Sequence, residues 1–134
     1  MRTSVRVGDE EFIVNIPASW DSGEVDGLIE TLTVLQLPED DALQAFLALS
    51  DVNAGTDDIM ESFHEAFVDT FESDEQALRA LSPFEEWEND LAEWCIDHGI
   101  EHEALDWNLA PLMTRLRDIY DLVKLNGKIY AFAK

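Results

Sequence analysis

Basic residues are scarce in this sequence, and long apolar runs are absent from it. Eight Lys and Arg face thirty Asp and Glu, which gives a formal net charge of −22. A charge of this sign and size disfavours direct binding to nucleic acid or to anionic membranes and favours cationic partners. No apolar run approaches the length of a membrane span, and no signal-peptide pattern is present, so we expect neither membrane insertion nor secretion.

Cysteine is nearly absent too, and no catalytic constellation can be found. Cys95 is the single cysteine, so it cannot form an internal disulfide, which fits a reducing cytoplasm. The sequence has no glycine-rich phosphate loop. Carboxylates are so frequent that no pair stands out for acid–base chemistry. We therefore expect a cytoplasmic protein that is not an enzyme and needs no cofactor.

Two patterns resemble parts of metal sites but are incomplete. Cys95, His98 and His102 have ligand-like spacing, yet a zinc site needs about four ligands and no second Cys/His pair exists. His64 is followed by a glutamate as in a zincin motif, but Val68 stands where the second histidine is required. We expect no metal.

The apolar residues that are present predict one folded α+β domain. Hydrophobic residues make up 46% of the 134 positions, too many for a disordered acidic tail. Residues 4–7 and 11–16 alternate around Gly8-Asp9, and residues 121–125 and 128–132 flank Asn126-Gly127, so each pair predicts a hairpin. Helical periodicity predicts the helices between them, and single residues predict where these begin and end. The expected caps are Asp21 or Ser22, Thr56, Ser73 and Ser82, the expected first-turn prolines are Pro38, Pro83 and Pro111, Gly99 is the expected stop, and one short turn is expected between 101 and 107. These helices cover about 22–35, 38–49, 57–72, 74–81, 83–98 and 111–119.

The predicted architecture is central acidic helices flanked by an N-terminal and a C-terminal β-hairpin. Helices grouped between strands favour α+β over an alternating βαβ order. Residues 1–134 form one domain in this interpretation, with possible subdomains at 1–37 and 38–134.

The acids follow a pattern that solubility does not require. Between Val7 and Thr114 there are 28 acids and a single base, Arg79. Like charges three or four residues apart destabilise a helix, and a protein selected only for solubility would intersperse lysines. We therefore predict that acids opposite the apolar stripes bind a partner. This acidic tract comprises Glu61, Glu65, Asp69, Glu72, Glu85, Glu86, Glu88, Asp90, Glu93 and Asp97.

The total charge matches that of a short DNA duplex. DNA carries one charge per roughly 1.7 Å of axis, so the charge of −22 corresponds to about 37 Å, or about eleven base pairs. A compact domain of this length would be roughly 36 Å across.

Several short features follow one another between residues 42 and 132. They are Ala-Leu-Gln-Ala-Phe-Leu at 42–47, Ser-Phe-His-Glu-Ala-Phe-Val-Asp-Thr-Phe-Glu-Ser at 62–73, Leu-Asp-Trp at 105–107, Arg-Leu-Arg-Asp at 115–118 and the terminal hairpin at 127–132. In this order they resemble the ArdA antirestriction family, small acidic proteins of plasmids, transposons and phages.

The resemblance implies an elongated, commonly dimeric protein that imitates bent duplex DNA and occupies the DNA groove of a type I restriction–modification enzyme. Asp106, Trp107, Arg117 and Asp118 then lie in the region that the family associates with antirestriction and self-association. Three alternatives stay open. They are an anti-CRISPR or other phage-type inhibitor of a DNA-binding protein, an acidic adaptor or chaperone for a basic protein, and an ordinary protein of a salt-rich cell.

Overall fold

The α+β class is confirmed. The computed structural model describes residues 1–134, with every side chain except that of His102. Its elements are β1 (Arg2–Val7), β2 (Glu10–Asn15), α1 (Ser22–Val34), η1 (Leu37–Glu39), α2 (Asp41–Leu47), α3 (Ile59–Ala66), β3 (Phe67–Phe71), α4 (Asp74–Leu81), α5 (Phe84–Asp97), η2 (His102–Ala104), α6 (Leu109–Ile119), β4 (Tyr120–Leu125) and β5 (Lys128–Ala133).

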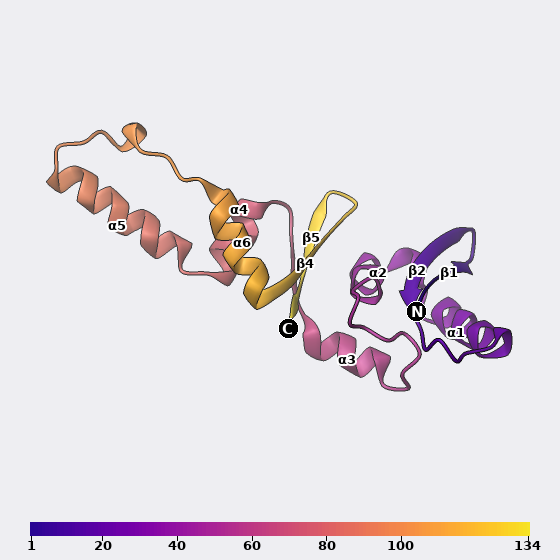
Figure 1. Cartoon of the computed structure of the whole chain (residues 1–134). Helices are drawn as coiled ribbons and strands as arrows, with labels where there is room; N and C mark the ends of the chain where they lie inside the picture. The colour runs from indigo at the N-terminus through magenta and orange to yellow at the C-terminus, as the bar shows by residue number, and fades with distance from the viewer.

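The molecule is elongated, with the N-terminal hairpin near one end and α5 at the other (Figure 1). Its solvent-accessible surface is 8480 Å², whereas a compact monomer of 15.2 kDa would expose about 7,100 Å². We call residues 1–66 the N-terminal lobe and residues 74–119 the helical arm. The charge comparison with DNA assumed a compact domain, and the elongated shape shows that this assumption was wrong.

Both hairpins occur at the predicted places. β1 and β2 pair antiparallel around a turn in which Gly8 has a φ of 63°. β4 and β5 pair around Asn126 and Gly127, whose φ values of 52° and 78° are the positive values that a two-residue hairpin turn requires. The two hairpins belong to separate sheets.

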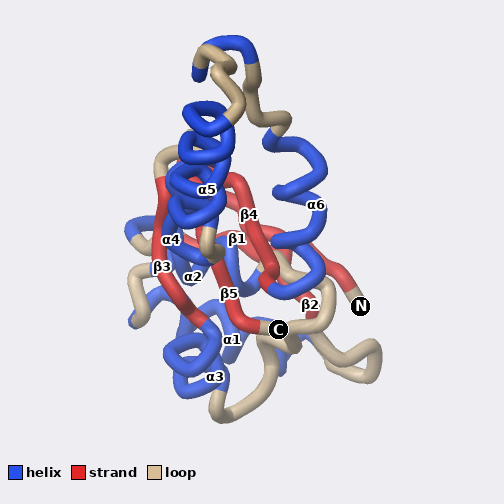
Figure 2. Tube along the Cα trace, turned by 90° about the vertical axis from the view of Figure 1, so that its left-hand side faces the viewer, coloured by secondary structure: helices blue, strands red, loops and turns tan.

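A third strand in the C-terminal sheet was missed in the sequence. The sheet order is β3-β5-β4, and β3 pairs with β5 from Phe67 opposite Phe132 to Phe71 opposite Ile129. In β5, residues 129–132 are buried in succession, so the strand is covered on both faces. Figure 2 shows β5 between its two neighbours, with α3 below them, α5 above and α6 beside β4.

The helix predicted over 57–72 is therefore wrong in its second half. α3 ends at Ala66, and Asp69 and Glu72 lie on or just beyond β3 rather than on a helix face. Pairing with β5 satisfies the backbone of 67–71, and it outweighs the local helical pattern. Thr56 is not the cap either, because its hydroxyl donates to the carbonyl of Asn53 and α3 begins after Asp58.

Three predicted helix starts shift by a few residues. Pro38 lies in the short η1 helix, and α2 begins separately after Asp40, whose carboxylate accepts from the Leu43 N–H at 3.0 Å. Pro83 is the residue before α5 rather than its first. α6 begins before Pro111, with Asn108 as its cap.

Other local predictions are confirmed. Asp21 caps α1, and Ser73 caps α4, each by accepting a backbone N–H three residues on. Gly99, with a φ of 65°, ends α5 in the left-handed conformation, and the Ile100 N–H returns to the Cys95 carbonyl at 2.9 Å. The short turn expected between 101 and 107 is η2.

The largest apolar core lies in the N-terminal lobe and includes the end of β5. Side chains of β1, β2, α1, α2 and α3 pack together there with Tyr130 and Phe132, so residues on both sides of position 37 share it. The arm has a smaller core of Leu78, Phe84, Met113 and Leu116. The arm therefore depends on few apolar contacts, and α5 projects beyond them.

Candidate functional site

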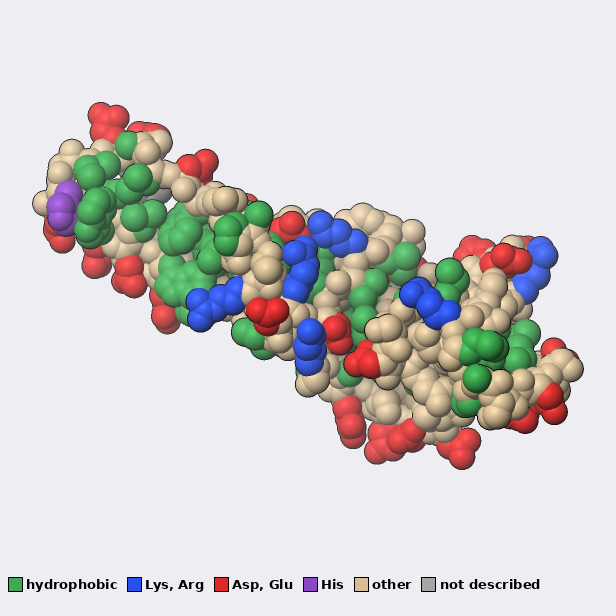
Figure 3. Space-filling view, viewed as in Figure 1, with side chains coloured by type: hydrophobic (Ala, Val, Ile, Leu, Met, Phe, Trp, Pro, Cys, Tyr) green, Lys and Arg blue, Asp and Glu red, His purple; other side chains and the backbone are tan. Residues whose placement is uncertain are grey.

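The acidic tract lies on the surface of the molecule. No charged side chain is buried among those that the structure describes, and every member of the tract is exposed except Glu88, which is half-buried. Six members belong to α5, Glu61 and Glu65 to α3, and Asp69 to the edge strand β3. Figure 3 shows acidic side chains along the margin of α5 and below α3.

Glu88 forms an ion pair within the protein, so its charge is not free to contact a partner. Together with Glu75 of α4 it binds Arg79, whose Nη2 lies 2.9 Å from Glu88 Oε2 and 2.7 Å from Glu75 Oε1. The guanidinium also lies over the Phe84 ring, 5.2 Å from its centroid. Hydrogen bonds to Glu88, and then to Glu75, raise the pKa of Arg79, so this cation stays charged at any working pH. The prediction that Glu88 mimics a phosphate is therefore weakened.

The remaining cations are separated from the tract. Lys124 and Lys134 lie beside Asp74 and Asp121, at 3.5 and 3.9 Å. Arg115 and Arg117 on α6 are exposed and form no ion pair with any side chain that the structure describes. Basic side chains gather in the middle of the face in Figure 3, between the arm and the N-terminal lobe. The acidic margins of α5 and α3 are thus left largely without internal counter-charges.

The four residues of the family-like region fall into two places. Asp106 and Trp107 precede α6, where the Trp107 ring packs edge-on against Phe84 at 5.1 Å and the Asp106 carboxylate accepts the Trp107 N–H at 2.9 Å. Arg117 and Asp118 lie near the other end of α6, about 12 Å further along the helix axis. These two pairs therefore do not form a single site.

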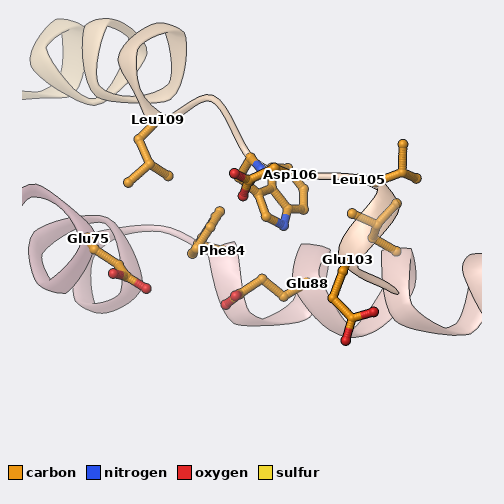
Figure 4. Close-up of a pocket in the computed structure, with 9 residues that line it drawn as sticks. Glu75, Phe84, Glu88, Glu103, Leu105, Asp106 and Leu109 are labelled. Atoms are coloured by element: carbon orange, nitrogen blue, oxygen red, sulfur yellow. The ribbon is translucent and has the colours of Figure 1, made fainter. Parts of the chain in front are cut away.

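A cavity of about 450 Å³ opens between Phe84 and Asp106 (Figure 4). We call it the aromatic cavity. Its lining comprises Glu75, Phe84, Glu88, Leu91, Glu103, Leu105, Asp106, Trp107 and Leu109. In Figure 4, Asp106 hangs from the segment before α6, above Phe84 and Glu88 of α5. The sequence prediction named Glu88, Asp106 and Trp107 among its candidate residues but missed Glu75 and Glu103. The i, i+4 spacing of Glu75 and Arg79 was a local signal for Glu75.

A second hollow, of about 230 Å³, is mainly apolar and lies between the α4–α5 junction and α6. We call it the apolar hollow. Trp87, Leu112 and Ile119 line it, with Arg115 beside them. Two turns along α5, Trp94 is also exposed and stacks on His98 at 4.2 Å. The arm thus exposes large apolar side chains to solvent, among them Trp94 and Ile119.

The metal pattern considered in the sequence gains no support from the described side chains. His102 lies outside them, and no three His, Cys, Asp or Glu among them are placed to hold a metal ion. Cys95 is buried, whereas His98 is exposed. No helix within the described part of the chain has both the length and the apolar character of a membrane span. Comparisons with models of protein families, with curated proteins and with solved structures find no significant match to this chain.

Proposed function

We propose that this protein is a DNA-mimic inhibitor that competes with duplex DNA for the binding groove of a type I restriction–modification enzyme. The observation that carries the proposal is the exposed acidic tract along an elongated body whose cations are gathered elsewhere. A basic groove built for phosphates attracts such a surface at long range and discriminates little between carboxylate and phosphate charge.

The alternatives differ from this proposal in testable ways. An anti-CRISPR or another phage-type inhibitor would use the same surface against a different DNA-binding machine. An acidic adaptor would bind a basic protein that need not contact DNA. A protein adapted to a salt-rich cell would need high salt to screen the repulsion among its acids, so it would unfold at low salt. The proposed mimic stays folded at tens of millimolar salt.

The direct test is competition at a restriction enzyme. Purified protein is titrated against labelled duplex DNA bound to a type I methyltransferase core, and the bound DNA is followed by fluorescence anisotropy. We expect stoichiometric displacement at about 50 mM salt, weakening by at least roughly tenfold at about 200 mM salt, because charge contacts dominate.

Two controls make this result decisive. Bovine serum albumin, another acidic protein, is added at the same molar concentration to test whether any polyanion suffices. It should displace no DNA. Circular dichroism at both salt concentrations establishes that the protein is folded throughout. A folded protein that leaves the DNA bound at tens of micromolar contradicts the type I target.

Self-association is a second part of the proposal. The apolar hollow and the nearby Trp94 are exposed, and Arg115 at the rim has no acidic partner within the described part of its own chain. A second copy would cover the apolar surface and could supply an acid to Arg115. Because two chains of charge −22 repel, added salt should strengthen this association while it weakens binding to the target.

Sedimentation velocity provides the measurement. Ile119→Asp places a charge in the apolar hollow and is expected to raise the dimer dissociation constant by about tenfold or more. Ile96→Asp is the matched control, because Ile96 is also exposed but lies two residues from Trp94, on another side of α5. Equal effects of both variants, or a monomer at all concentrations, would contradict this interface.

A further inference from the structure

The aromatic cavity, which is open to solvent on one side, brings apolar side chains and carboxylates together. Phe84 and Trp107 form an edge-to-face pair at one side, and Leu91 extends the apolar surface along α5. Its volume of about 450 Å³ lies within the usual range for ligand sites, roughly 300–1,000 Å³. No basic residue is among those that line it, although Arg79 contacts three of them. An occupant with an apolar stem and a positive end would match both parts of the lining.

Arg79 shows that one wall of the cavity already holds a guanidinium group. Its charged end lies over Phe84 and binds Glu75 and Glu88, three residues that also line the cavity. An aromatic face combined with two carboxylates is the environment in which arginine binds more favourably than lysine, because its planar group stacks and forks. The chain itself therefore demonstrates the chemistry of this wall.

Two further carboxylates that line the cavity do not bind Arg79. Glu103 and Asp106 form no ion pair with any described side chain, and the Asp106 carboxylate accepts a hydrogen bond from the backbone N–H of Trp107. The indole of Trp107 contacts Phe84 and is half-buried. Carboxylates and an aromatic ring thus occur a second time around the same space, here without a cation.

We propose that the aromatic cavity binds an alkylguanidinium group between Trp107 and the carboxylates of Glu103 and Asp106. The inference rests on the proposed function for the identity of the partner, because grooves that bind DNA carry arginines for phosphate contacts. One such arginine would enter the cavity and anchor the inhibitor by shape as well as by charge. The chemistry of the cavity itself is independent of that function.

A small probe tests the cavity without any enzyme. N-acetyl-L-arginine N-methylamide is titrated into ¹⁵N-labelled full-length protein, and the indole N–H signal of Trp107 is followed after assignment with Trp107→Phe. We expect a saturable shift, and the citrulline analogue, which has the same shape without the charge, should bind at least about tenfold more weakly. No shift of Trp107 at about 50 mM probe, or equal binding of both analogues, overturns the proposal.

Paired variants separate the cavity from the general field of the protein. Glu103→Gln with Asp106→Asn should weaken probe binding by about fivefold or more, since it removes the two unpaired carboxylates. Asp26→Asn with Glu30→Gln on α1 removes the same charge from exposed sites away from the cavity, and should change binding by less than about twofold. Equal weakening by both pairs overturns a specific site.

DNA displacement then distinguishes the source of the guanidinium. Loss of displacement by Glu103→Gln/Asp106→Asn but not by the α1 pair assigns the cavity to an arginine of the target. If both pairs displace DNA equally while only the cavity pair weakens probe binding, an arginine of the target is overturned as the source. The ligand of the cavity is then a free guanidinium compound. If the wild-type protein binds the probe but displaces no DNA, the proposed function fails while the cavity stands. If the wild-type protein displaces DNA but does not bind the probe, the cavity proposal fails while the proposed function stands.

Discussion

Conversion of five exposed acids of α5 to amides is expected to weaken DNA displacement by about 30-fold at low salt. The variant combines Glu85→Gln, Glu86→Gln, Asp90→Asn, Glu93→Gln and Asp97→Asn. Each exposed charge pair with the target groove is worth roughly a factor of two, and five such factors multiply to about 30. Glu88 is kept, because it binds Arg79. Anisotropy competition measures the effect, and it should shrink as salt rises.

The fold should survive these changes. Like charges at i, i+3 and i+4 on α5 repel, so their removal relieves the helix, although amides at its first turn lose a favourable interaction with the helix dipole. Urea-induced unfolding checks that this variant and its control variant in the N-terminal lobe are equally folded.

A second variant of the same charge provides the control. Asp9→Asn, Glu11→Gln, Glu24→Gln, Asp26→Asn and Glu30→Gln change three Glu and two Asp, all exposed in the N-terminal lobe. We expect this variant to lose less than about threefold in displacement, since its acids lie outside the acidic tract. If both variants lose the same amount, net charge alone determines binding and the tract has no special role.

Phe132→Ala is expected to lower the free energy of unfolding by about 3–5 kcal/mol, a large part of the roughly 5–15 kcal/mol of a typical domain. Phe132 is fully buried on β5, and its ring lies 5.5, 6.5 and 5.7 Å from the rings of Phe46, Phe63 and Phe67. It therefore joins the C-terminal sheet to α2 and α3. Urea unfolding followed by circular dichroism and tryptophan fluorescence measures the loss.

Two further variants show whether the loss comes from burial at this position. Phe132→Leu keeps most of the volume and should cost less than about 1.5 kcal/mol. Ile13→Ala, at an exposed position of β2, should stay within about 0.5 kcal/mol of the wild type. A loss below about 1 kcal/mol for Phe132→Ala would mean that the aromatic cluster does not hold the lobe and the sheet together.

Local features of the fold could be predicted from neighbouring residues. Asp21 and Ser73 cap helices because a short polar side chain reaches the backbone N–H three positions on. Asn126-Gly127 forms a hairpin because both residues tolerate positive φ. The net charge, too, is a property of the composition and does not depend on the fold. For the caps and the hairpin turn, no information beyond a few consecutive residues was needed.

The strand β3 could not be predicted in this way. Residues 67–71 continue the apolar pattern of α3, so the local signal favoured a longer helix. They become a strand because β5, some sixty residues later, is buried on both faces and needs a second neighbour. This pairing moves Asp69 from the expected helix face to a sheet edge.

The candidate site also has features that composition determines and features that only tertiary packing determines. That the acids are numerous and exposed follows from composition, since so many charges cannot be buried unpaired. The aromatic cavity requires α4, α5 and the segment before α6 to meet, which brings Glu75, Glu88 and Trp107 around Phe84 from positions far apart in the chain. Composition and short-range geometry thus determined the charge, the caps and the turns. Packing between distant segments decided where those charges lie and which of them line a cavity, because such contacts form only when the whole chain has folded.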